Sequence, residues 1–146
     1  MASPPVPSTG RVVGIDPGSR RIGVAVSDAS RTIATPVATI DGRDRVRARR
    51  QISDMVSEWD AVGIVIGLPR SLDGTEGPAA SRVRHEAQAL SEVVSVPVVF
   101  HDERLSTVEA HRRLRESGLT DERSRRGTVD QAAAAVVLQA WIDAGR

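Results

Sequence analysis

The sequence has no cysteine and no lysine, and aromatic residues make up only 2% of it. Without cysteine there are no disulfide bonds, no thiolate metal ligands and no cysteine nucleophile. So few aromatic side chains argue against a surface on which single-stranded bases stack. No apolar run approaches the roughly 18 residues that span a bilayer, and residues 1–10 lack the basic start and apolar core of a signal peptide. We therefore expect a cytoplasmic protein.

All 20 basic residues are arginine, yet the formal net charge is only +1. A near-neutral total argues against tight, indiscriminate coating of DNA. The arginines nevertheless gather in clusters, at 43–50, 112–115 and 123–126. Their planar guanidinium groups suit bidentate contacts with phosphate. A solvated helix face would show the same pattern, so the clusters by themselves leave both interpretations open.

The hydrophobic pattern predicts an α/β domain with elements in the order βββαβαβαα. Expected strands are 11–16, 21–27, 32–40, 60–67 and 96–100, and expected helices are 43–59, 79–94, 106–117 and 128–144. Alternation in the second half favours parallel strands with helices on both faces. The prolines in residues 1–10 indicate a disordered tail. One folded domain over 11–146 is expected from the length.

The stretch around Asp16 is the most informative in the chain. A short apolar strand ends at Asp16, and a tight Pro-Gly-Ser turn leads into the next strand. Burying an unpaired carboxylate is costly. Beside backbone N–H groups, Arg20 and Arg21, this carboxylate could instead hold a metal ion or face a phosphate. The same residues also favour an ordinary hairpin turn.

Three further acids could join Asp16, because ligands of open α/β sheets bind at the carboxyl ends of strands. Asp102 and Glu103 follow the strand 96–100, and Asp130 shares a helix face with apolar residues. The alternative is local: both segments also contain capping boxes, so these acids could serve only helix starts. Together the acids favour a divalent-metal site. Oxygen ligands without histidine or cysteine select Mg²⁺ or Mn²⁺, and two such ions about 4 Å apart support phosphodiester hydrolysis.

A glycine- and proline-rich loop, 67–78, follows a buried strand and should border the same crevice. Loops this long are uncommon as simple connectors in small domains. The arginines expected to contact substrate phosphates are Arg20, Arg21, Arg70 and Arg104.

Taken together, these segments resemble the YqgF/RuvX family. The resemblance rests on four blocks in order, at 14–28, 67–80, 102–107 and 129–141. It implies an RNase-H-like fold, with a five-stranded mixed sheet flanked by helices and a second strand antiparallel to its neighbours. Members are described as Holliday junction resolvases or as nucleases that mature pre-16S ribosomal RNA.

The resemblance also implies roles for the acids. Asp16, Glu103 and Asp130 are expected to be the catalytic and metal-binding residues, with Asp102 an alternative to Glu103. The implied reaction is hydrolysis of phosphodiester bonds with Mg²⁺ or Mn²⁺, leaving 5′-phosphate and 3′-hydroxyl ends. Maturation of the 5′ end of pre-16S ribosomal RNA is the preferred function, and resolution of four-way DNA junctions in recombination and repair is the alternative.

The expected partners are structured RNA or branched DNA, and a ribosomal precursor particle, with no membrane. A resolvase needs a homodimer to cut two symmetry-related strands, whereas an RNA-end nuclease can act as a monomer. Two other classes stay open: a non-catalytic ribosome- or RNA-binding factor, and phosphotransfer of the kind in actin-like ATPases. The latter clamp a nucleotide between two such domains, and this chain has the length of one.

Overall fold

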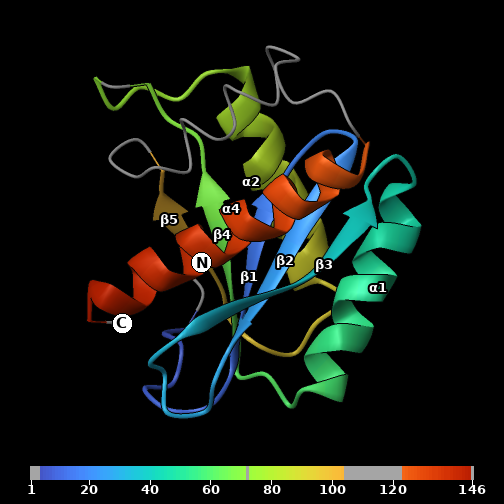
Figure 1. Cartoon of the computed structure of the whole chain (residues 1–146). Helices are drawn as coiled ribbons and strands as arrows, with labels where there is room; N and C mark the ends of the chain where they lie inside the picture. Colours follow the sequence, from blue (N-terminus) through green and yellow to red (C-terminus); the bar gives the residue numbers. More distant parts are fainter. Residues whose placement is uncertain (1–3, 72, 104–122, 146) are drawn as a thin grey trace.

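In the computed structural model, which describes residues 4–71, 73–103 and 123–145, five strands form one mixed sheet (Figure 1). The strands are β1 (Val12–Pro17), β2 (Arg21–Ser27), β3 (Ala34–Asp41), β4 (Gly63–Leu68) and β5 (Val98–Asp102). Their order across the sheet is β3-β2-β1-β4-β5. Strand β2 is antiparallel to both neighbours, whereas β1, β4 and β5 run parallel. The predicted mixed sheet with an antiparallel second strand is confirmed.

Helices cover both faces of the sheet. Helix α4 (Arg123–Asp143) crosses one face, and α1 (Arg45–Glu58) and α2 (Pro78–Ser91) pack on the other (Figure 1). Each face has its own apolar core, one between the sheet and α4 and a larger one under α1 and α2. The predicted α/β architecture is therefore confirmed.

Strand β1 shows how the sheet divides its side chains between the two cores. Val13 and Ile15 belong to the core under α1 and α2, whereas Val12 belongs to the core under α4. Successive side chains of a strand alternate between faces. Gly14 and Asp16 therefore share the α4 face with Val12, and a Cβ on Gly14 would lie 2.7 Å from Leu138 Cβ.

Two helix starts follow recognisable sequence signals. Asp44 caps α1, because its side chain accepts a hydrogen bond from the Arg47 N–H. Pro78 is the first residue of α2. Its missing N–H costs no hydrogen bond, because an N–H at this position has no partner within the helix. No helix among the described residues has both the length and the apolar character to cross a membrane.

Some element ends differ from the prediction. Strand β5 covers Val98–Asp102 rather than 96–100, and Pro97, which has no N–H to donate, precedes it. Helix α4 begins at Arg123, ahead of the predicted start at Thr128. The predicted capping box at Thr128 therefore lies within the helix rather than at its start. The predicted helix 106–117 lies outside the described residues.

The segment before β1, expected to be a tail, makes specific contacts with the sheet layer. Arg31 donates hydrogen bonds to the carbonyls of Pro7 (2.6 Å) and Gly10 (2.9 Å). A Cβ on Gly63 would lie 2.7 Å from the Val6 side chain, which packs against the core under α4. These contacts attach the chain from Val6 onward to the connection between β2 and β3 and to the start of β4.

Candidate active site

Strand β1 places Asp16 at the carboxyl end of the sheet, on the face covered by α4. The residue is only 1% exposed. Across the antiparallel pair, Asp16 lies opposite Gly23 of β2. The turn between the two strands is tight, because a Cβ on Gly18 would lie 2.2 Å from the Arg21 carbonyl oxygen. The strand and its turn therefore fix a buried carboxylate at the middle of the sheet edge.

Helix α4 brings Asp130 to the neighbouring strand. A Cβ on Gly23 would lie 1.9 Å from the Asp130 carbonyl oxygen, so the helix backbone approaches β2 at a place that only glycine allows. Asp130 is 3% exposed, and its Oδ2 accepts a hydrogen bond from Arg21 Nε at 2.7 Å. Arg21 therefore supplies a positive charge to this acid from the first residue of β2.

Glu103 reaches the same face from the other side of Asp16. Its backbone N–H donates to the Leu68 carbonyl at 3.2 Å, which extends the contact between β5 and β4 by one residue. A Cβ on Gly67 would lie 2.0 Å from Glu103 Oε1, so the carboxylate occupies the space above this glycine. Gly67 directly follows Ile66, which pairs with Ile15. Glu103, 2% exposed, thus lies over the strand position beside Asp16.

Asp102 belongs to the opposite face of the sheet. Phe100, two residues earlier on β5, packs against the core under α1 and α2, and strand alternation places Asp102 on that same side. The Asp102 side chain is 31% exposed and lies 3.6 Å from Arg70 Nη1. Of the two acids that end β5, Glu103 shares the face of Asp16 and Asp102 does not.

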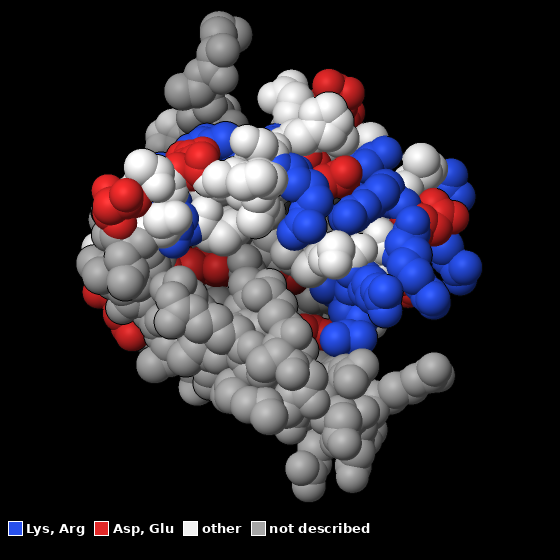
Figure 2. Space-filling view, turned by 90° about the horizontal axis from the view of Figure 1, so that it is seen from above, with Lys and Arg blue, Asp and Glu red and all other residues white. Residues whose placement is uncertain are grey.

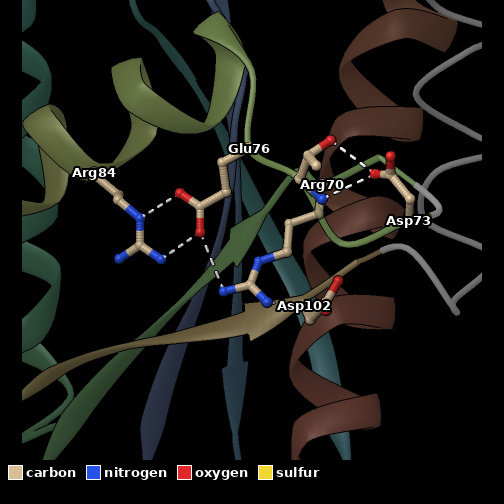
Figure 3. Close-up of polar contacts among 6 residues, drawn as sticks. Arg70, Asp73, Glu76, Arg84 and Asp102 are labelled. Atoms are coloured by element: carbon tan, nitrogen blue, oxygen red, sulfur yellow. Dashed lines mark hydrogen bonds and ion pairs between the residues drawn. The ribbon is translucent and has the colours of Figure 1, made fainter.

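The loop after β4 carries a charge network that includes Arg70 (Figure 3). Arg70 lies between Glu76, at 3.2 Å, and Asp102. Arg84 of α2 binds Glu76 through two hydrogen bonds of 2.6 and 2.7 Å. The hydrogen bond from Arg84 lowers the pKa of Glu76, so the carboxylate stays ionised. This network ties the loop and the start of α2 to the end of β5.

Within the loop, Asp73 accepts hydrogen bonds from the backbone N–H and the hydroxyl of Thr75, at 3.0 and 2.7 Å. These bonds form a compact turn of the Asx type. Arg70 Nε is buried and donates to no described residue. Arg70 was predicted to contact phosphate; its Nη atoms face acids of this chain, and Nε remains a donor not used by the described residues.

The four acids thus fall into two groups: Asp16, Glu103 and Asp130 lie at one end of the α4 face, and Asp102 lies on the other face. Their donor atoms are all oxygen, which suits hard divalent cations. No group of three or more histidine and acidic side chains is arranged to hold a metal ion in the part of the chain that the structure describes. The fold gathers the carboxylates into one region, with Arg21 bound to one of them.

The predicted arginines have different surroundings. Arg20 is exposed in the β1–β2 turn, Arg21 binds Asp130, and Arg104 lies outside the described residues. Sequence reasoning missed the contact of Arg21 with Asp130 and the part played by Gly23 and Gly67. The sequence did contain a signal for these glycines. Each occupies a strand position that points to the face of the sheet on which Asp16 lies.

Comparisons with known proteins find relatives that match most of this chain. A protein of Streptomyces avermitilis, named "Putative pre-16S rRNA nuclease", is 46% identical over 138 residues, covering 94% of this chain and 88% of its own. A Rhodococcus opacus protein of the same name is 48% identical over 143 residues, covering 94% of this chain and 79% of its own.

Solved structures show the same fold at low sequence identity. RuvC of Thermus thermophilus, solved in complex with a Holliday junction substrate, superposes with a TM-score of 0.58 at 13% identity, over 92% of this chain and 94% of that one. The fowlpox virus resolvase, solved with Holliday junction DNA, gives a TM-score of 0.56 at 8% identity, over 92% and 97%.

The family model described as "RuvX: Holliday junction resolvase" matches residues 10–144. This match covers nearly the whole chain, including all four acids, and agrees with the two relatives. The protein therefore belongs to the RuvX family.

Proposed function

We propose that the protein is a metal-dependent nuclease that hydrolyses phosphodiester bonds, with Asp16, Glu103 and Asp130 as its catalytic acids. The observation that carries this proposal is the burial of all three carboxylates at one end of one sheet face. Carboxylate oxygens gathered at the carboxyl ends of strands are the donors that a hard divalent cation prefers. Membership of a family with nuclease-named relatives supports the same conclusion.

The three carboxylates would hold Mg²⁺ or Mn²⁺, with Asp16 between the other two. The chemistry such an ion would supply here is activation of a water molecule and neutralisation of charge on the leaving oxygen. Asp16, at the rigid end of β1, orients the site, while Glu103 and Asp130 approach it from β5 and α4. Arg21 holds Asp130 in place at 2.7 Å and would balance its charge when no cation is present. Arg20, in the turn that follows Asp16, and Arg70, in the loop after β4, would orient the backbone of the nucleic acid.

The preferred substrate is the 5′ end of pre-16S ribosomal RNA, because the closely similar relatives carry that name. A four-way DNA junction is the second candidate, since RuvC in complex with such a junction has the same fold. The two differ in what they need: paired cuts in a junction require a homodimer, whereas an RNA end can be cut by a monomer or with a ribosomal precursor particle as partner.

The two substrates should be tested side by side, with labelled precursor RNA and a labelled four-way junction in Mg²⁺ and in Mn²⁺. Cleavage of the RNA alone is the expected result, with Asp16→Asn as the blank. Symmetric paired cuts in the junction alone would indicate that the protein resolves junctions and does not mature RNA. Binding without cleavage under either metal would contradict the nuclease proposal and indicate a non-catalytic binding factor.

A second prediction concerns Gly67, which makes room for Glu103. In Gly67→Ala the new Cβ would meet Glu103 Oε1 at 2.0 Å, and the carboxylate, as the end of a flexible side chain, should move. We expect weaker metal binding, by about 10- to 100-fold as for other changes that misplace metal ligands. The readout is the rise in melting temperature with added Mn²⁺, which reports metal binding without catalysis.

The control is Gly77→Ala, because a Cβ at Gly77 meets no atom within 4 Å. This variant should keep the melting response of the unsubstituted protein. If Gly67→Ala keeps it as well, Glu103 does not bind the metal from its present position.

A further inference from the structure

A hollow lies behind the turn that carries Asp16, on the face of the sheet covered by α1 and α2. Its rim includes Arg45 and Arg49 of α1 and Arg82 of α2, and the turn residues Pro17 and Gly18 also line it. We call Arg45, Arg49 and Arg82 the arginine ridge. Because Gly18 is two residues from Asp16, the arginine ridge and the candidate active site flank one turn from opposite faces of the sheet.

The charge of the arginine ridge is only partly balanced. Arg49 Nη1 lies 3.2 Å from Glu86 Oε2, but no ion pair joins Arg45 or Arg82 to another described residue. Arg45 Nη2 reaches the Ser19 carbonyl at 3.4 Å, toward the β1–β2 turn. Figure 2 shows Arg side chains gathered on one side of the molecular end that carries this turn.

The two acids that directly precede α1 in the sequence already have partners. Asp44 caps α1, and Asp41 binds Arg43 through hydrogen bonds that lower its pKa to about 2. The first turn of α1 contains no acid, although it contains Arg45 and Arg47. Positive side chains at a helix N-terminus oppose the helix dipole, where acids are normally stabilising. This unfavourable placement costs stability, and a bound polyanion would offset it.

The size of the hollow restricts what binds there. Its volume is about 40 Å³, enough for only about three or four water molecules at roughly 10–15 Å³ each. Its floor is apolar, formed by residues such as Ile15, Ile52 and Leu90. A nucleobase would need more room, so the contact belongs to the guanidinium groups on the rim and to phosphates that pass over them.

We infer that the arginine ridge binds the phosphate backbone of the nucleic-acid substrate on the side of the β1–β2 turn away from the three acids. The inference rests on the proposed nuclease function, since it places a backbone across the turn beside Asp16. Guanidinium groups offer the bidentate geometry that phosphates accept. The ridge would position the chain without reading its sequence, as phosphate contacts do.

The test measures binding of labelled precursor RNA and a labelled four-way junction to Asp16→Asn protein, which leaves the substrates intact, over a series of salt concentrations. Arg45→Gln and Arg82→Gln should each weaken binding by about five- to tenfold at low salt and reduce the salt slope by about 1. Arg11→Gln is the matched control, because Arg11 is exposed just before β1, at the far end of that strand from the turn. It should change affinity by less than about twofold.

Ridge variants that bind like Arg11→Gln would overturn the inference. A loss of affinity with an unchanged salt slope would also overturn it, because such a loss indicates a structural effect rather than a lost phosphate contact. The outcome is separable from the proposed function. If the unsubstituted protein cleaves nothing but binding depends on Arg45 and Arg82, the nuclease proposal fails and the ridge remains a binding surface. If the unsubstituted protein cleaves and the ridge variants bind normally, the nuclease proposal stands and only the inference about the arginine ridge is wrong.

Discussion

Replacing Asp16 by asparagine is expected to abolish cleavage while the protein stays folded. The residue is 1% exposed and lies on the middle strand, between the positions occupied by Glu103 and Asp130. Asparagine keeps the size but removes the charge that a divalent cation requires. Loss of one group that acts directly on the transition state commonly lowers the rate by about 10²–10⁴-fold, and we expect the upper part of that range. Initial rates with Mg²⁺ and Mn²⁺ measure it.

The melting temperature of Asp16→Asn should be equal to or above that of the unsubstituted protein without metal, because a buried charge beside other acids is removed. Added Mn²⁺ should no longer raise it.

Asp102→Asn is the matched control for this prediction. Asp102 is an acid of the same type at the same edge of the sheet, but it lies on the other face beside Arg70. Its loss should lower the rate far less than the loss of Asp16, because Asp102 lies on the face of the sheet away from the other three acids. Equal losses of cleavage rate in the two variants would indicate that Asp102 also binds the metal. Full activity of Asp16→Asn would contradict the proposed site.

Gly23→Ala is expected to have the largest effect on stability. The added Cβ would lie 1.9 Å from the carbonyl oxygen of Asp130 and 2.5 Å from its carbonyl carbon. These are backbone atoms of α4, whose apolar face is fixed against the sheet by buried residues such as Leu138 and Trp141. The helix must therefore move as a body. Overpacking typically costs about 1–3 kcal/mol, and we expect a loss at or above the top of that range.

Unfolding in urea measures this loss, with Gly77→Ala as the control that meets no neighbouring atom. Gly77 is the N-cap of α2, and alanine in place of a glycine N-cap costs at most about 1 kcal/mol, so the control should lose much less stability than Gly23→Ala. Equal stabilities of the two variants would contradict the close approach of α4 to β2. If Gly23→Ala still folds, it should also bind Mn²⁺ more weakly, because Asp130 moves with the helix.

The proposed site depends on α4 and β5 being held against β1 by contacts distant in sequence. The Arg21–Asp130 bond joins residues 109 positions apart. Glu103 meets Gly67 only because β4 and β5 pair in the register that places Leu68 beside Asp102. Neither contact can be formed by a segment in isolation, which is why the site is expected to be lost as a unit when the packing of α4 is disturbed.

The sequence by itself determined the features that depend on short-range pattern. Alternating and continuous apolar runs predicted the strands, and a strand that ends in Asp16 before a proline-glycine turn predicted the position of the first acid. Helical spacing predicted that Asp130 would face the sheet with Ala134 and Val137, and all three are buried. These features follow from local backbone geometry, which repeats every two residues in a strand and every 3.6 in a helix.

Only the tertiary structure decided which side chains meet. The prediction left Asp102 and Glu103 open; β5 ends at Asp102, and alternation places the two acids on opposite faces. Arg21 could have faced solvent and binds Asp130 instead. The physical reason is that strand register and helix placement result from packing the whole core, and a shift of one residue in a strand exchanges the faces of all its side chains.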